Sequence, residues 1–203
     1  LLDGSTLLWP AEPALIAQYG RPSNQHGESH WPVLRLVAGF DLYSGALETL
    51  AEGPYRTSEQ DLAVTVITEA GAGFLWVGDR NFGVYQMVQG AHHSHAEVLL
   101  RLTGSRAKAL AKQAGSTLRP GDDLLLRWAP SPETSRVPSL PAVPIAGRLI
   151  YWRWERPGFR PKDLYLFTTL TDHEQYPIAE LVQLYARRWG VELDLRHVKA
   201  TLD

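Results

Sequence analysis

The sequence contains no cysteine among its 203 residues. This absence excludes a disulfide-bonded scaffold and a zinc site built from thiolates, and it suits a reducing compartment. Long apolar runs are also missing, because no stretch approaches the roughly 18 residues of a membrane-spanning helix, and no signal peptide opens the chain. The hydrophobic content of 44% is typical of a globular protein and excludes a disordered chain. Because the chain begins within an expected strand and ends within an expected helix, we expect it to be a fragment of a longer protein.

Basic residues are scarce in the first half of the chain. Residues 1–100 contain 4 Lys and Arg against 11 Asp and Glu, a net charge of −7, whereas residues 101–203 contain 16 against 11, a net charge of +5. A protein that binds nucleic acid is usually basic on its contact face. The acidic half therefore counts against such a partner unless metal ions offset its charge, and phosphate contacts are expected in the basic half.

Apolar runs separated by turn residues predict alternating strands and helices. Ser58 and Gly71 are typical of the beginning and end of a helix, and Ser44-Gly45 predicts a hairpin turn. The expected strands are residues 1–8, 33–43, 45–52, 74–77, 97–102, 123–128, 148–154 and 164–169. The expected helices are residues 59–69, 84–89 and one that opens at Pro177. The expected loops are residues 10–30 and the proline-rich residues 129–147.

This order of elements predicts an α/β fold with a ribonuclease-H-like mixed sheet and flanking helices, interrupted by a β-rich insertion before the last helix. We expect the first part of the core over residues 1–104, the insertion over 105–162, and the last strand and helix over 163–203. In such a sheet Asp3 lies on the first strand and Asp79 at the end of the fourth. The two side chains can then be neighbours although they are 76 positions apart in the sequence.

The last helix carries four polar side chains beside an apolar stripe. The stripe, at helical spacing, consists of Leu184, Val191, Leu195 and Val198. At about 100° per residue, the polar side chains project within roughly 60° of one another. They are Tyr185, Arg188, Glu192 and Lys199. One interpretation is a solvated face with a few ion pairs. The other is a functional face, on which a carboxylate binds a metal and the flanking cations hold phosphates.

The spacing Tyr185-x2-Arg188-x3-Glu192-x6-Lys199 resembles the signature helix of the DDE transposases of the insertion-sequence-4 type. The segments Leu1-Leu2-Asp3-Gly4-Ser5-Thr6 and Trp76-Val77-Gly78-Asp79-Arg80-Asn81-Phe82-Gly83 are similar to the two aspartate segments of that family. The resemblance covers nearly the whole chain, including a β-rich block between the second aspartate and the glutamate. It implies a metal-dependent DNA transposase that hydrolyses the phosphodiester at transposon ends and joins the 3′-hydroxyl to target DNA.

The resemblance implies a catalytic triad of Asp3, Asp79 and Glu192. Three such carboxylates can hold two Mg²⁺ ions about 4 Å apart, with Mn²⁺ as a substitute. Hard oxygen ligands suit these metals and not zinc. The hypothesis is that Asp3 bridges both ions, while Asp79 and Glu192 each complete the coordination of one.

The resemblance also implies contacts with double-stranded DNA, at the transposon ends and at the target. Tyr185, Arg188 and Lys199 would bind DNA on either side of the cut, with Trp189 and Arg80 as further contacts. A homodimer of the full-length protein, without membrane association, and a cytoplasmic, nucleoid-associated location in a prokaryote are expected with it. Two alternatives stay open: a catalytically inactive, transposase-derived DNA-binding protein, and a general ribonuclease-H-like nuclease.

Two further clusters have structural and functional interpretations. Trp152 and Trp154 share one face of an expected strand, and a core position is favoured over stacking on an unpaired base. His92, His93 and His95 lack cysteine partners and helical spacing, so a solvated loop is favoured over a metal cluster.

Overall fold

The structure, a computed structural model, describes residues 1–25, 27–130, 137–155 and 162–188. Its elements are β1 (Leu2–Leu8), α1 (Pro13–Tyr19), β2 (Ser23–Asn24), β3 (Gly27–Glu28), β4 (Val33–Phe40), β5 (Leu47–Pro54), α2 (Glu59–Ala70), β6 (Leu75–Gly78), α3 (Tyr85–His93), β7 (Glu97–Leu102), α4 (Gly104–Gln113), β8 (Asp123–Trp128), β9 (Ile145–Trp154) and β10 (Lys162–Thr168). Residues 178–188 form a further helix, which begins directly after Pro177. In these ranges no helix is long and apolar enough to cross a bilayer.

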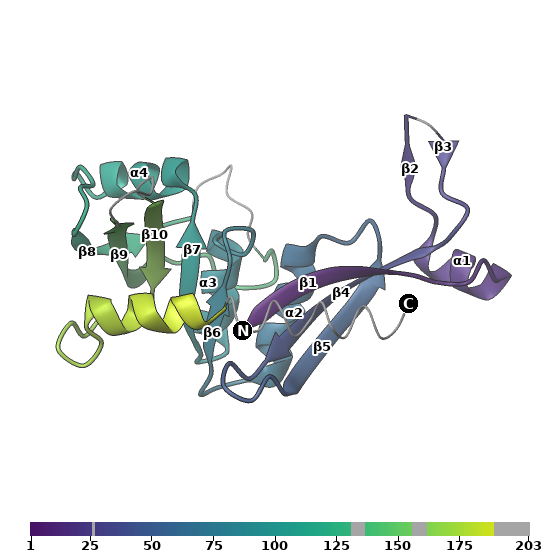
Figure 1. Cartoon of the computed structure of the whole chain (residues 1–203), viewed down its shortest axis with the longest axis horizontal. Coiled ribbons are helices and arrows are strands. Elements are labelled where there is room, and N and C mark those ends of the chain that lie inside the picture. The colour runs from purple at the N-terminus through teal and green to yellow at the C-terminus, as the bar shows by residue number, and fades with distance from the viewer. Residues whose placement is uncertain (26, 131–136, 156–161, 189–203) are drawn as a thin grey trace.

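The strands form two main sheets that lie side by side (Figure 1). One is antiparallel in the order β1-β4-β5, and the other is mixed in the order β6-β7-β10-β9-β8, with β6 parallel to β7. β1 contacts β6, but no ladder of backbone hydrogen bonds joins them in the described part of the chain. The expected α/β class with a mixed sheet and flanking helices is confirmed, and the arrangement is consistent with a ribonuclease-H-like fold.

The five-stranded sheet is covered differently on its two faces. On the face that we name the first face, α3 and α4 pack together with α2 and form the larger apolar cluster, which includes Leu100. On the second face, the 178–188 helix packs through Leu181 and Val182 onto a smaller cluster, which includes Leu99. Because successive residues of a strand point to opposite faces, β7 contributes alternately to both clusters. The second face therefore positions the helix that carries the predicted signature.

Residues 9–32 form an arm that leaves the sheet after β1 and returns at β4. Its base is closed by the pairing of Leu8 with Val33. α1 begins with Pro13, whose missing N–H is tolerated in a first turn, and ends at Gly20, where φ is 71°. β2 and β3 pair with each other and, with α1, project away from β4 (Figure 1). The prediction that residues 10–30 are a loop was wrong, because a proline and a glycine here delimit a short helix.

A second correction concerns the start of the block expected to be β-rich. α4 occupies its first residues, and the hydroxyl of Thr103 caps this helix by accepting a hydrogen bond from Arg106 N at 3.3 Å. The remaining expected strands of the block are confirmed as β8 and β9, with β9 beginning earlier, at Ile145. Both belong to the five-stranded sheet, through pairing of β9 with β10. The division into residues 1–104, 105–162 and 163–203 stays a prediction.

The prediction for the tryptophan pair agrees with the structure, whereas the prediction for the histidine cluster agrees only in part. Trp152 and Trp154 are half-buried and pack against the cluster of the second face, as expected for core positions. α3 is longer than the predicted helix, so His92 and His93 lie in its exposed last turn and not in a loop. His95 follows in a turn with φ of 56°.

Candidate active site

Asp79 lies directly after β6, at the beginning of a tight loop that leads to α3. Its Oδ1 accepts a hydrogen bond from Asn81 N at 2.8 Å, and its carbonyl accepts one from Phe82 N at 3.1 Å. Phe82 is 2% exposed and packs into the first face. A Cβ at Gly83 would collide with the carbonyl oxygen of Arg101, so only glycine fits there. These contacts fix the carboxylate of Asp79 at the end of its strand.

Asp3 is half-buried on β1, where it pairs with Ala38 of β4. Its Oδ1 accepts a hydrogen bond from Gly4 N at 2.9 Å. Alternation along the strand places Asp3 on the side of Leu1, which packs in the second-face cluster together with Val77 of β6. Because β1 contacts β6, Asp3 and Asp79 lie on neighbouring elements and on the same side of the molecule.

The 178–188 helix brings Tyr185 and Arg188 to the same place. Both are buried, at 0% and 5% exposure, and the guanidinium carbon of Arg188 lies 5.7 Å from the centre of the Tyr185 ring. Burial raises the pKa of the Tyr185 phenol above its ordinary value; Asp79 adds to this rise, whereas Arg188 and Arg101 oppose it. The phenol, the two guanidinium groups and the carboxylate of Asp79 therefore form one electrostatic cluster.

Two side chains at this site were missed by the sequence analysis. Arg101 occupies the β7 position two residues after Leu99, and hence the second face. A charged residue at this position in a buried strand is a signal that could have found it. Glu59 stands in the first turn of α2, and its Oε2 accepts a hydrogen bond from Asn81 Nδ2 at 2.6 Å. No sequence signal indicates this contact, because acidic residues are common in first turns.

The structure places some of the predicted site residues and not others. Those near the second face are Asp3, Asp79, Tyr185 and Arg188. Arg80 is exposed next to Asp79. Trp189, Glu192 and Lys199 lie outside the described residues. The structure therefore brings Asp79 together with Tyr185 and Arg188 and places Asp3 on a strand that contacts β6, while the roles of these residues and the position of Glu192 stay predictions.

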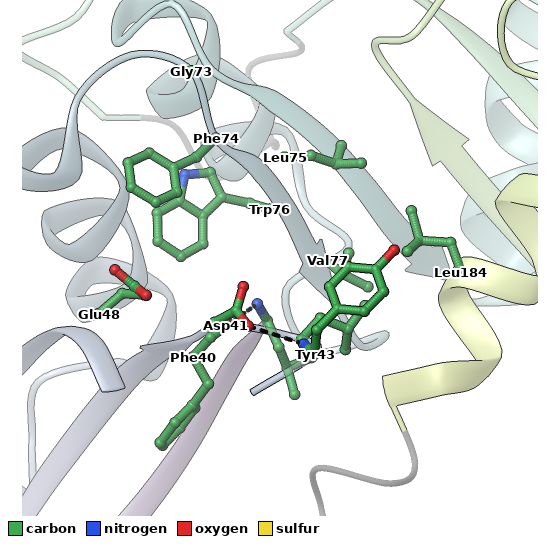
Figure 2. Close-up of a pocket in the computed structure, with 12 residues that line it drawn as sticks. Phe40, Asp41, Tyr43, Glu48, Gly73, Phe74, Leu75, Trp76, Val77 and Leu184 are labelled. Carbon is green, nitrogen blue, oxygen red and sulfur yellow. Dashed lines mark hydrogen bonds between the residues drawn. The ribbon is translucent and has the colours of Figure 1, made fainter. Parts of the chain in front are cut away.

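A pocket of about 360 Å³ where the two sheets meet is separate from these residues. Phe40 at the end of β4, with Asp41 and Tyr43 in the turn that follows, lines it opposite Trp76 of β6 and Leu184 of the helix (Figure 2). Backbone N–H groups within that turn, at distances of 2.7 and 3.1 Å, donate to the carboxylate of Asp41 and lower its pKa. Of the two carboxylates that line the pocket, Asp41 and Glu48, that of Asp41 therefore stabilises its own turn.

A family model with the description "Transposase DDE domain" matches residues 1–203, the whole chain. The chain belongs to the transposase DDE domain family. This DDE domain is also 25% identical over 205 residues to "Transposase InsG for insertion sequence element IS4" of Escherichia coli (strain K12). The alignment covers 99% of this chain and 44% of that protein, so the chain spans less than half the length of this relative. The resemblance predicted from the signature helix and the two aspartate segments is confirmed.

Membership of the family implies a divalent metal ion. The carboxylates of Asp3 and Asp79 provide the hard oxygen donors that such ions prefer, and in each a backbone N–H orients Oδ1. Among the residues that the structure describes, no group of three His, Cys, Asp or Glu side chains is close enough to hold a metal ion. The third predicted ligand, Glu192, lies beyond them. The chemistry of the two aspartates fits part of the predicted metal site, for which Glu192 stays the predicted third ligand.

Proposed function

We propose that the protein containing this DDE domain is a DNA transposase of the insertion-sequence-4 type. It would hydrolyse the phosphodiester at the ends of a transposon and transfer the resulting 3′-hydroxyl to double-stranded target DNA, as a homodimer of the full-length protein in the cytoplasm of a prokaryote. The observation that carries the proposal is the match of the whole chain to the DDE family. The assembly of Asp79, Tyr185 and Arg188 at the second face supports it, because it joins a potential metal ligand to a cationic group.

In the proposed reaction, Asp3, Asp79 and Glu192 would hold two Mg²⁺ ions, for which Mn²⁺ could substitute. When bound, the ions lower the pKa of the attacking water or 3′-hydroxyl and stabilise the leaving oxygen. The residues that the structure describes contribute by orienting the carboxylates of Asp3 and Asp79. The backbone N–H groups of Gly4 and Asn81 hold one oxygen of each aspartate, so the carboxylates need little reordering when a metal ion arrives.

The same proposal assigns DNA contacts to the cationic and aromatic groups around the carboxylates. The exposed Arg80 provides a charge for a backbone phosphate. A tyrosine phenol is protonated near neutral pH, and burial raises the pKa of the Tyr185 phenol further, so its hydroxyl would act as a hydrogen-bond donor to a phosphate oxygen. Arg188 lies beside it and offers a guanidinium. Trp189 and Lys199 would extend this contact along the DNA.

The proposal is tested by Asp79→Asn and Asp3→Asn in the full-length protein, with a duplex that carries the ends of the element. Each substitution keeps the size of the side chain and removes the anionic oxygen. Because even indirect support of a metal site is worth about 10–100-fold in activity, we expect each variant to lose more than about 100-fold in end cleavage. End binding should persist. Glu69→Gln, at an exposed position near the end of α2, is the matched control and should cleave normally.

Each other outcome selects a different function. Undiminished cleavage by both asparagine variants would contradict the proposed metal site. A wild-type protein that binds the ends without cutting them in Mg²⁺ or Mn²⁺ would be the inactive DNA-binding alternative. Equal cutting of duplexes with and without the ends would indicate a general nuclease.

A further inference from the structure

The two predicted catalytic aspartates stand on different sheets. Asp3 belongs to β1 and Asp79 follows β6, and these strands touch without a ladder of hydrogen bonds in the described part of the chain. In a continuous sheet, such a ladder would hold neighbouring strands about 4.7–4.9 Å apart. Here no backbone pairing between β1 and β6 sets the separation of the two carboxylates, so contacts of side chains between the two segments become important.

Glu59 is a side chain that reaches both elements. Its Oε2 accepts the hydrogen bond from Asn81 Nδ2 at 2.6 Å, which ties it to the loop of Asp79. On the other side it crosses β1 at Gly4, where an added Cβ would lie 3.0 Å from Glu59 Cδ and 3.1 Å from its Oε2. α2, which carries Glu59, packs against β4, β5 and α3. The helix therefore holds the carboxylate of Glu59 between the two aspartate segments.

Gly4 and Asn81, which lie against the Glu59 side chain, each hold one of the aspartates. Gly4 N donates to Asp3 Oδ1 at 2.9 Å, and Asn81 N donates to Asp79 Oδ1 at 2.8 Å. A second bond from α2, between Gln60 Nε2 and Asn81 O at 2.9 Å, restrains the same loop. A continuous series of contacts thus runs from one carboxylate through Glu59 to the other.

We propose that Glu59 is a positioning residue that sets the separation of Asp3 and Asp79. The inference rests on the proposed function, because the separation of the two aspartates affects catalysis only if both take part in it. It assigns a role to Gly4, since a Cβ there would lie 3.0 to 3.3 Å from the Glu59 side chain, which would have to shift from its position beside Asn81. It requires a hydrogen-bond acceptor at position 59 and not a negative charge, because the bond comes from a neutral amide. A displacement of about 1 Å in a reacting group can cost about 10²-fold in rate.

The test compares Glu59→Ala, Glu59→Gln and the control Glu69→Ala in the full-length protein. Hydrogen exchange of the 79–83 segment is measured without DNA or metal, and kcat and KM are measured for end cleavage. We expect Glu59→Ala to speed exchange of this segment and to lower kcat by about 10–100-fold, with KM changed by less than about 2-fold. Glu59→Gln, which keeps an acceptor oxygen, should rescue both properties, and Glu69→Ala should match the wild type.

If the 79–83 segment of Glu59→Ala exchanged its amide hydrogens at the wild-type rate, the proposal would be overturned. A Glu59→Gln variant as impaired as Glu59→Ala would also overturn it, because the charge and not the contact with Asn81 would then matter. Hydrogen exchange needs neither substrate nor metal, so it tests the contact of Glu59 with Asn81 even if the wild-type protein does not cut DNA. A failure of the wild type to cut DNA would count against the proposed function alone.

The substitution Gly4→Ala provides an independent test of the same proposal. It should slow cleavage in the wild-type background, because the new methyl group displaces Glu59. In the Glu59→Ala background it should have no further effect. Equal losses in both backgrounds would show that Gly4 acts without Glu59 and would overturn the proposal.

Discussion

The two faces of the five-stranded sheet bury polar groups of different kinds. On the first face, α3 buries Gln89, a neutral amide, to 2% exposure. On the second face, the buried groups include the cations Arg148 and Arg188, at 0% and 5% exposure. A neutral amide can be satisfied by backbone groups alone, whereas a buried charge requires an opposite charge or a ligand. The comparison indicates that neutral polar groups are buried on the first face, where backbone groups satisfy them, and that buried charges are held on the second face, where losing a partner should cost more stability.

The largest expected effect tests the most tightly held charge of the second face. Arg148 forms two hydrogen bonds with the carboxylate of Asp123, and its Nη1 donates to the carbonyl of Tyr176 at 2.7 Å. We expect Arg148→Met to lower the free energy of unfolding by about 3–5 kcal/mol, because the carboxylate of Asp123, whose side chain is 10% exposed, loses its guanidinium partner and keeps only the exposed His173, 3.0 Å away. It should also loosen the segment that leads into the 178–188 helix. Urea unfolding monitored by circular dichroism measures the loss.

The matched control for this substitution lies on the same strand. Arg153 pairs with Asp163 at 2.7 Å, but both side chains are 36% exposed. Arg153→Met should therefore cost only about 0–1 kcal/mol. If Arg148→Met and Arg153→Met lowered the free energy of unfolding equally, burial of the charge on the second face would have no special cost, and the comparison would be refuted.

A smaller effect is expected for the neutral amide of the first face. Gln89 accepts a hydrogen bond from Val137 N at 2.8 Å and donates to three carbonyls of the segment 137–141. Gln89→Ala should lower the free energy of unfolding by about 1–3 kcal/mol, because these backbone groups lose their partner. The exposed Gln113→Ala is the control and should change it by less than about 0.5 kcal/mol. A loss for Gln89→Ala as large as that for Arg148→Met would remove the distinction between the faces.

The smallest effect concerns the proton of Tyr185. Burial raises its pKa in the folded protein above the value of about 10 found in unfolded chains. The stabilisation from the neutral phenol is therefore complete below about pH 10 and is lost as the pH rises through the folded pKa. Above about pH 10, the unfolding free energy of the wild type should fall more steeply than that of Tyr185→Phe. Parallel curves from pH 8 to pH 11 would contradict this.

The local parts of the fold were predictable because their signals lie within a few residues. Ser58 accepts a hydrogen bond from Asp61 N at 3.0 Å, as expected of a cap, and α2 ends before Gly71, where φ is 78°. α4 was missed although Thr103 provides a similar cap. Gly104 follows this cap at the first helical position, and glycine lowers the helical propensity on which such a prediction depends.

The candidate site was predictable only where its residues follow a local spacing. Asp79 ends a short apolar strand, and Tyr185 has a fixed spacing to the other signature residues. Glu59 gave no comparable signal, and neither did Arg148 elsewhere on the second face, because their contacts join distant parts of the chain. Glu59 and Asn81 are 22 positions apart. A first-turn glutamate and a strand arginine each have an ordinary local explanation, and only tertiary packing reveals their partners.

The arm of residues 9–32 has a consequence for imaging the protein on DNA. Because Leu8 and Val33 already close the strand pair, the register of β1 does not depend on the length of chain between them. Doubling the length of a flexible loop adds only about 0.6 kcal/mol to the entropic cost of its closure. A fluorescent module inserted between β2 and β3 would therefore leave Asp3 in place, and would carry its dye on a projection away from the carboxylates.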